Sequence, residues 1–135
     1  MDDYLAEREN GTRRKNILVI DDDVMYLRSI HDWLSDRYSV TMMNSAASGI
    51  TYLAKNKTDL ILLDYERPVT SGPEVLKMLR SDEDTKRIPV FFLTGRSDKE
   101  SVMNVMAYKP EGYILKTVEK NELLEKLNDF FMTRQ

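Results

Sequence analysis

Carboxylates follow two apolar runs of this sequence, each where a buried strand would end. Asp21 and Asp22 come directly after the run 17–20, and Asp64 closes the run 60–63. A carboxylate beside a dry core is costly unless it has a partner or a function. Because sites in open parallel sheets lie at the carboxyl ends of the strands, these side chains are predicted to share one edge. Three such oxygen ligands suit Mg²⁺.

Two further polar groups follow later strands. Thr94 comes after the apolar run 88–93, and Lys116 after the short run 112–115. A Thr or Lys in this position is usually only a loop residue, so each is weak evidence alone. Together with the carboxylates they suit phosphoryl chemistry, because a hydroxyl and an ammonium group can bind phosphoryl oxygens. A carboxylate can also be the nucleophile that accepts the phosphoryl group.

The elements that must hold these groups alternate between strand and helix five times. Strands are predicted at 16–20, 38–43, 59–64, 88–93 and 112–115, and helices at 24–36, 45–56, 72–81, 97–108 and 118–132. Asp23 is expected to cap the first helix, and the apolar stripe of that helix is Val24, Leu27, Ile30 and Leu34. The pattern predicts an α/β fold with a single doubly wound, five-stranded parallel sheet. Its expected strand order is 2-1-3-4-5, flavodoxin-like, with helices on both faces.

Composition indicates one soluble domain. The chain has 135 residues, of which 41% are hydrophobic and 32% charged. It has no cysteine, and its net charge of −3 gives no basic excess for nucleic-acid binding. With no membrane span or signal peptide visible, a cytoplasmic location without membrane binding is expected. Residues 1–15 are expected to be a flexible lead, 16–132 the domain and 133–135 a tail.

Four motifs, in this order, resemble the receiver domain of two-component response regulators. They are residues 17–22 (ILVIDD), 62–64 (LLD) with Pro68 and Gly72 at the family's offsets, 93–95 (LTG) and 112–116 (GYILK). The resemblance covers about residues 16–132, and the ordered set is highly specific. It implies phosphorelay signalling, in which a sensor histidine kinase or a phosphotransfer domain phosphorylates the receiver in a Mg²⁺-dependent reaction.

The resemblance also implies roles for the acidic residues. Asp64 would be the phosphoacceptor and would carry the aspartyl phosphate. Asp22 would bind Mg²⁺ directly and Asp21 mainly through water. The backbone carbonyl of Glu66 would be a further ligand.

A conformational switch follows from the same resemblance. Thr94 would hydrogen-bond the phosphoryl oxygens, Lys116 would pair with them, and Tyr113 matches an aromatic whose rotamer accompanies movement of Thr94. The face formed by helix four, strand five and helix five would then change and control an unidentified output domain or protein. A homodimer through that face is left open. The domain would catalyse only its own phosphorylation and dephosphorylation, so it is not expected to be a classical enzyme.

The sequence departs from the family pattern at three places. Arg67 stands where Met is commonest, residues 109–112 replace a commoner Gly-Ala pair before strand five, and Thr117 follows Lys116 where Pro is usual. The usual Lys–Pro bond is commonly cis, whereas a cis bond before a non-proline costs about 2.5–4 kcal/mol. The Lys116–Thr117 bond is therefore either trans or a strained cis bond.

Glu66 and Arg96 lie two residues after Asp64 and Thr94, so both side chains should overhang the mouth of the site. One hypothesis is that they form a pair that limits access of hydrolytic water. The alternative is that both point to solvent, where such a pair contributes about 0–1 kcal/mol.

Three rival functions fit less well. A receiver-like interaction module that is never phosphorylated typically lacks one of the site residues, all of which are present here. A hydrolase of the haloacid dehalogenase type needs Asp-x-Asp-x-Thr or Val, and Met25 occupies the last of these positions after Asp21 and Asp23. No Gly-x-Gly-x-x-Gly motif follows a strand, which excludes a Rossmann nucleotide-binding domain.

Overall fold

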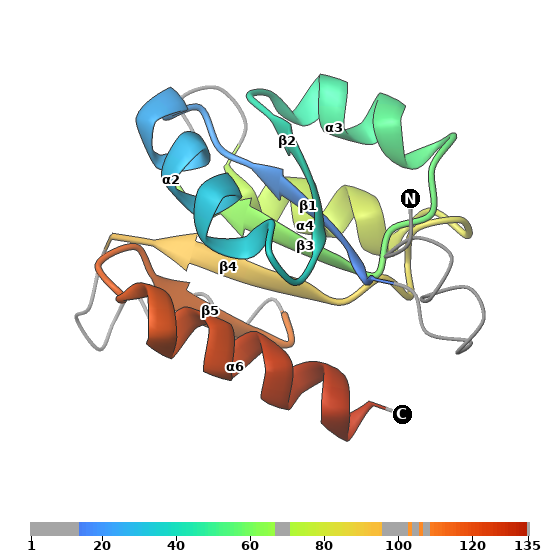
Figure 1. The fold of residues 1–135 in the computed structure, drawn as a ribbon. Helices are drawn as coiled ribbons and strands as arrows, with labels where there is room; N and C mark the ends of the chain where they lie inside the picture. The colour runs from blue at the N-terminus through green and yellow to red at the C-terminus, as the bar shows by residue number, and fades with distance from the viewer. Residues whose placement is uncertain (1–13, 67–70, 96–102, 104–105, 107–108, 135) are drawn as a thin grey trace.

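Five parallel strands form a single sheet in the computed structural model, which describes residues 14–66, 71–95, 103, 106 and 109–134 (Figure 1). The strands are β1 (Asn16–Ile20), β2 (Ser39–Met43), β3 (Leu60–Asp64), β4 (Val90–Thr94) and β5 (Gly112–Leu115). Their order is β2-β1-β3-β4-β5, which confirms the predicted order.

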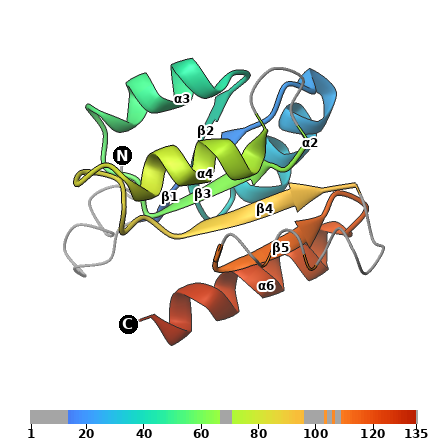
Figure 2. The ribbon, with the colours of Figure 1, turned by 180° about the vertical axis from the view of Figure 1, so that it is seen from behind.

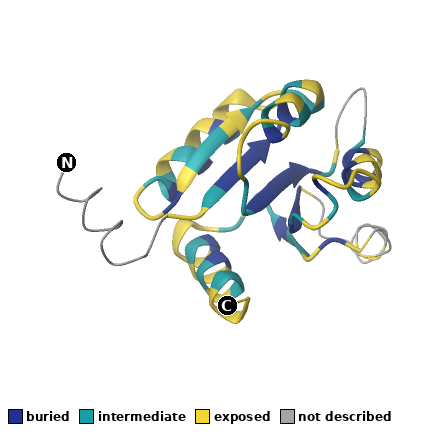
Figure 3. Ribbon diagram, turned by 90° about the vertical axis from the view of Figure 1, so that its right-hand side faces the viewer, coloured by how far each residue is buried: buried dark blue, intermediate teal, exposed yellow. Residues whose placement is uncertain are grey.

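The central strands β1, β3 and β4 are apolar apart from Asn16 at the start of β1, Asp64 at the end of β3 and Thr94 at the end of β4, because both of their faces are covered. Every residue of β3 and β4 is buried, whereas the edge strand β2 is partly exposed (Figure 3). Strand β4 begins at Val90 rather than at 88, because Pro89 has no N–H to give to the ladder. The register pairs Ile20 with Leu63, and Asp64 with Leu93. The residues at the ends of β1, β3 and β4 therefore meet at one edge.

In the part of the chain that the structure describes, four helices cover the two faces of the sheet (Figures 1 and 2). Helices α2 (Val24–Leu34) and α6 (Lys120–Thr133) lie on one face, and α3 (Ala46–Leu53) and α4 (Gly72–Arg80) on the other. The sheet has one hydrophobic core on each face. Successive side chains of β1 point alternately into these two cores, as the two-residue period of a strand requires. Ile17 and Val19 pack with α2 and α6, and Leu18 and Ile20 with α3 and α4.

The ends of the helices show where the sequence interpretation succeeded and failed. Asp23 caps α2 as predicted, accepting hydrogen bonds from the backbone of Met25 and Tyr26. Val24 was wrongly assigned to the buried stripe: its side chain is 56% exposed, because the first turn of α2 projects past the sheet edge. Helix α6 begins at Lys120 rather than at 118, with Glu119 at its N-cap position.

The helix predicted at 97–108 falls largely outside the described residues, as do the lead before residue 14 and Arg67. Met103 and Met106 are helical and exposed. Within the described ranges, no helix is both long enough and apolar enough to cross a bilayer.

Candidate functional site

Three carboxylates meet at the carboxyl edge of the sheet. Asp21 follows β1, Asp22 comes next, and Asp64 is the last residue of β3; one carboxylate oxygen from each lies within 4.8 Å of the others. Asp21 is fully buried and Asp64 is 3% exposed, whereas Asp22 faces solvent. Two buried acids with an exposed acid beside them form a site that is open on one side.

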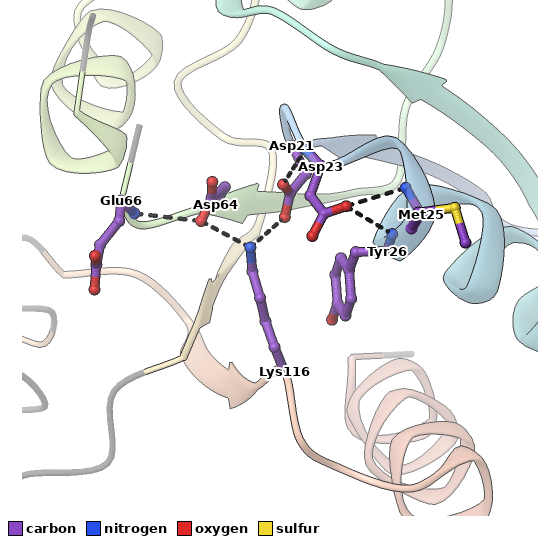
Figure 4. A network of polar contacts seen from close by, with 7 residues as sticks. All are labelled: Asp21, Asp23, Met25, Tyr26, Asp64, Glu66 and Lys116. Atoms are coloured by element: carbon purple, nitrogen blue, oxygen red, sulfur yellow. Dashed lines mark hydrogen bonds and ion pairs between the residues drawn. The ribbon is translucent and has the colours of Figure 1, made fainter. Parts of the chain in front are cut away.

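Lys116 joins the two buried carboxylates (Figure 4). Its Nζ lies 2.7 Å from Asp21 Oδ2 and 3.2 Å from Asp64 Oδ1. Lys116 is the residue that directly follows β5, and its side chain extends from there to the two carboxylates. The side chain is 23% exposed. Because three carboxylates face one ammonium group, the ionised site carries a formal charge of −3 + 1 = −2.

Backbone N–H groups hold the two buried acids in place. Asp21 Oδ1 accepts a hydrogen bond of 2.9 Å from the backbone of Asp23, and Asp64 Oδ1 accepts one of 3.3 Å from the backbone of Glu66. In both cases the donor is the backbone N–H of the residue two positions after the Asp. The chain therefore forms a tight turn around each carboxylate directly after the strand. The site is therefore built by the turns as well as by the strands.

The close approach of α4 to β3 depends on a glycine. A Cβ placed at Gly72 would lie 2.5 Å from the carbonyl oxygen of Asp64 and 2.8 Å from Cα of Tyr65. The N–H of Gly72 donates to the carbonyl of Tyr65 at 3.0 Å. A larger residue would push the start of α4 away from the end of β3 and disturb the backbone of Asp64.

The pKa values of Asp64 and Lys116 are shifted because both groups are at least partly buried and because the site holds three carboxylates but one ammonium group among the described residues. Burial, together with the charge of Asp21, raises the pKa of Asp64 from 3.8 to about 6, although Lys116 and the Glu66 N–H act in the opposite direction. Burial alone would lower the pKa of Lys116, but its two carboxylate partners outweigh this and raise it. Ionisation of Asp64 is therefore energetically unfavourable in the folded protein, whereas Lys116 stays charged.

Thr94 and Tyr113 lie on neighbouring strands. Thr94 is buried at the end of β4, and its carbonyl accepts a hydrogen bond of 2.8 Å from the backbone of Lys116. Tyr113 is half-buried on β5, and the Nζ of Lys126 lies 5.7 Å from the centre of its ring. Tyr113 also lines a hollow of about 760 Å³ with Thr117, on the surface between β5 and α6. Of the predicted switch pair, Thr94 thus lies at the site edge and Tyr113 beside that surface, and their coupling stays a prediction.

The structure decides one of the two open questions at the rim of the site. No cis peptide bond occurs among the described residues, so the Lys116–Thr117 bond is trans. Glu66 is exposed, and Figure 4 shows its side chain extending away from Asp64. Arg96 lies outside the described residues, so the proposed pair with Glu66 stays a prediction.

Sequence reasoning missed Tyr26, whose ring lies beside Lys116 in Figure 4. Its ring centre is 5.0 Å from Lys116 Nζ. Burial and then the charges of Asp21 and Asp64 raise the pKa of its hydroxyl, so the phenol stays neutral. The available signal was Asp23: an N-cap residue fixes the position of the residue three places later.

The donor set fits a divalent cation of the Mg²⁺ type. Carboxylate oxygens are the ligands that Mg²⁺ prefers, and it keeps part of its water shell at an open site. The exposed Asp22 leaves room for such water, and a 2+ ion would balance the formal charge of −2.

Comparisons with known proteins agree on one family. The family model of the response regulator receiver domain matches residues 17–128. The chain is 29% identical over 122 residues to the chemotaxis protein CheY-3 of Vibrio cholerae, covering 88% of this chain and 93% of that protein. It is 33% identical over 120 residues to the transcriptional regulatory protein DltR of Streptococcus agalactiae, covering 88% of this chain and 52% of DltR. The chain thus spans about half the length of that curated relative.

The fold has close counterparts among solved structures. The chemotaxis response regulator CheY4 of Vibrio cholerae superposes with a TM-score of 0.80 at 24% identity, covering 87% of this chain and 98% of that one. The N-terminal domain of a response regulator receiver protein from Methanoculleus marisnigri has a TM-score of 0.69 at 29% identity, covering 84% of this chain and 94% of that domain.

Proposed function

This chain belongs to the response regulator receiver family of two-component signalling, and we propose that it accepts a phosphoryl group on Asp64 in a Mg²⁺-dependent reaction. The observation that carries the proposal is the position of Asp64, a buried carboxylate that shares the ammonium group of Lys116 with the carboxylate of Asp21. The pairing of a buried, costly carboxylate with a fixed cation suits a nucleophile better than a structural ion pair.

The contacts of Asp64 favour different roles for its two oxygens. Lys116 Nζ and the N–H of Glu66 both approach Oδ1, which leaves Oδ2 as the nucleophile. Oδ2 attacks phosphorus, and the bond from phosphorus to the donor breaks. When the donor is a phosphohistidine, that bond is P–N, and its electron pair stays on the imidazole. Lys116 then offsets charge on the phosphoryl oxygens, as the hydroxyl of Thr94 does by hydrogen bonding.

Asp21, Asp22 and Asp64 would hold the metal, together with the backbone carbonyl of Glu66. When bound, Mg²⁺ supplies positive charge against the negative charge of the transferring phosphoryl group. The chain's own contribution is a set of carboxylates already gathered within 4.8 Å of one another.

The consequence of phosphorylation is a change of surface rather than turnover of a substrate. The new charge beside Thr94 would draw its hydroxyl inward, and Tyr113 would follow into the space released. Tyr113 borders the hollow between β5 and α6, so this movement would change the surface offered to a partner. The partners we propose are a cytoplasmic histidine kinase or phosphotransfer domain and an output domain or protein. Homodimerisation through the same surface is a further outcome of the switch.

Mass spectrometry tests the phosphoacceptor directly. The protein is incubated with Mg²⁺ and acetyl phosphate, and wild type is compared with Asp64→Asn and with Asp59→Asn. Asp59 provides the matched control because it directly precedes the opposite end of β3, where its Oδ2 accepts from the backbone of Asn16 at 2.7 Å. Wild type and Asp59→Asn are expected to gain one phosphoryl group, and Asp64→Asn none.

Other outcomes separate the alternatives. Modification that persists in Asp64→Asn would disprove the assignment of the phosphoacceptor. A protein that neither binds Mg²⁺ nor captures beryllofluoride would instead be an interaction module that is never phosphorylated.

The lifetime of the phosphoryl group tests the proposed pair of Glu66 with Arg96. If the pair limits access of water, the double variant Glu66→Ala with Arg96→Ala should lose phosphate faster than wild type. Equal lifetimes would show that the pair has no such role.

A further inference from the structure

Tyr26 completes a closed chain of contacts around the site (Figure 4). Asp21 Oδ1 accepts from the backbone of Asp23 at 2.9 Å, and Asp23 Oδ1 accepts from the backbone of Tyr26 at 3.2 Å. The ring centre of Tyr26 lies 5.0 Å from Lys116 Nζ, which lies 2.7 Å from Asp21 Oδ2. The chain of contacts begins and ends on one carboxylate and links the end of β1, the start of α2 and the end of β5.

The closed chain fixes the ammonium group of Lys116 from two directions. The carboxylates of Asp21 and Asp64 attract it, while the ring of Tyr26 offers its negative face within the range of a cation–π contact. Lysine is a flexible four-carbon stem with a strongly hydrated head, so it holds one position only when its surroundings restrict it. The ring limits the space available to that head and to competing water.

We propose that Tyr26 is a positioning residue that holds the Lys116 ammonium group where the phosphoryl oxygens will arrive. This inference rests on the proposed function. Tyr26 does not touch the reacting atoms, and its contribution is made through Lys116. Asp23 has a second role as well, because the N-cap that starts α2 also aims Tyr26.

The ring face and the phenol hydroxyl can be separated by substitution. Tyr26→Phe keeps the ring face beside Lys116, whereas Tyr26→Leu removes it and keeps an apolar side chain against the core. Tyr52→Leu is the matched control, since Tyr52 lies on α3 and its hydroxyl bonds Thr41 at 3.1 Å. It loses the same groups without contacting Lys116.

The maximal rate of phosphorylation by acetyl phosphate at saturating Mg²⁺ is the first readout. Tyr26→Leu should be roughly 3- to 10-fold slower than wild type, from the ordinary strength of a cation–π contact. Tyr26→Phe and Tyr52→Leu should stay within about twofold, because both leave that contact intact. A wild-type rate in Tyr26→Leu would overturn the proposal. An equal loss in Tyr52→Leu or in Tyr26→Phe would also overturn it.

The second readout needs no phosphorylation. In metal-free protein, the ring current of Tyr26 should shift the Lys116 Hε NMR signals upfield. The shift should persist in Tyr26→Phe and vanish in Tyr26→Leu. An unchanged signal in Tyr26→Leu would disprove the contact. If the signal changes as expected but wild type is never phosphorylated, the proposed function fails while the positioning of Lys116 stands.

Discussion

The two ends of the β-sheet handle charge in opposite ways. At the amino end, Arg80 donates to the carbonyl of Ile88 at 2.8 Å and to Glu111 Oε1 at 3.1 Å, and Glu111 Oε1 also accepts from the backbone of Val90 at 2.7 Å. In this clasp, formed by Arg80, Ile88, Val90 and Glu111, one cation meets one anion and backbone groups take the remaining contacts. At the carboxyl end, the carboxylates of Asp21 and Asp64 share one ammonium group, and a third carboxylate, that of Asp22, lies within 4.8 Å of both.

This difference in charge balance distinguishes an ion pair that stabilises the fold from one that is suited to chemistry. The clasp ties the end of α4 to the starts of β4 and β5, and its charges balance. The acidic site leaves Asp64 with a pKa raised to about 6, which is an unfavourable arrangement in the protein alone. Such local strain persists at functional sites because the rest of the fold supports it.

The largest effect is expected from breaking the clasp. Glu111→Ala should lower the free energy of unfolding by about 2–3 kcal/mol, because it removes the side-chain acceptor of the Val90 N–H and the only anion paired with Arg80 among the described residues. Urea denaturation measures the change. The matched control is Glu83→Ala, which removes an exposed pair with Lys86 at 2.9 Å. The control should lose less than about 0.5 kcal/mol. Similar losses in both variants would show that the clasp is no more than a surface ion pair.

At the carboxyl end of the sheet, removing a charge is expected to stabilise the protein rather than destabilise it. Without metal at pH 7.5, Asp64→Asn should raise the free energy of unfolding by about 2 kcal/mol, because it removes a buried charge that is repelled by Asp21. Asp59→Asn, which keeps an acceptor for the backbone of Asn16, should bring no such gain. If Asp64→Asn were less stable than wild type, the attraction of Lys116 would outweigh burial and repulsion, and the contrast between the two ends would fail.

The pH dependence of that gain sharpens the comparison. Asp64 takes up a proton near pH 6 in the folded protein and near pH 4 when unfolded, so between these values the folded state binds more protons. The destabilisation by ionised Asp64 is therefore fully present above pH 6 and fades as the pH falls toward about 4. The difference in urea midpoint between Asp64→Asn and wild type, measured in EDTA, should shrink over this range. A difference that does not vary with pH would assign the gain to packing.

The sequence predicted the acidic site better than it predicted the clasp. Asp21 and Asp64 follow apolar runs, and the rule that parallel strands end together places such residues in space without further information. Glu111 gives no such signal, because its partners become visible only when α4, β4 and β5 are packed side by side. Tyr26 was missed, and Val24 was wrongly assigned to the buried stripe, for a related reason. Helical periodicity describes the face that packs on the sheet and says little about the first turn beyond the sheet edge.

The smallest change in the free energy of unfolding is expected from the backbone of Lys109, close in sequence to Glu111 of the clasp. The strain at this residue comes from its backbone conformation and not from charge. Lys109 has a φ of 58°, a left-handed conformation that is unfavourable for a residue with a side chain. Lys109→Gly should therefore raise the free energy of unfolding by about 0.5–1 kcal/mol. Lys77→Gly, the same substitution inside α4, should lower it by about 1 kcal/mol. Thermal denaturation of both variants, alone and combined with Asp64→Asn, measures these effects. Because the two strained places lie at opposite ends of the sheet, their gains should add; a combined gain well below the sum would show that the ends are coupled through the sheet.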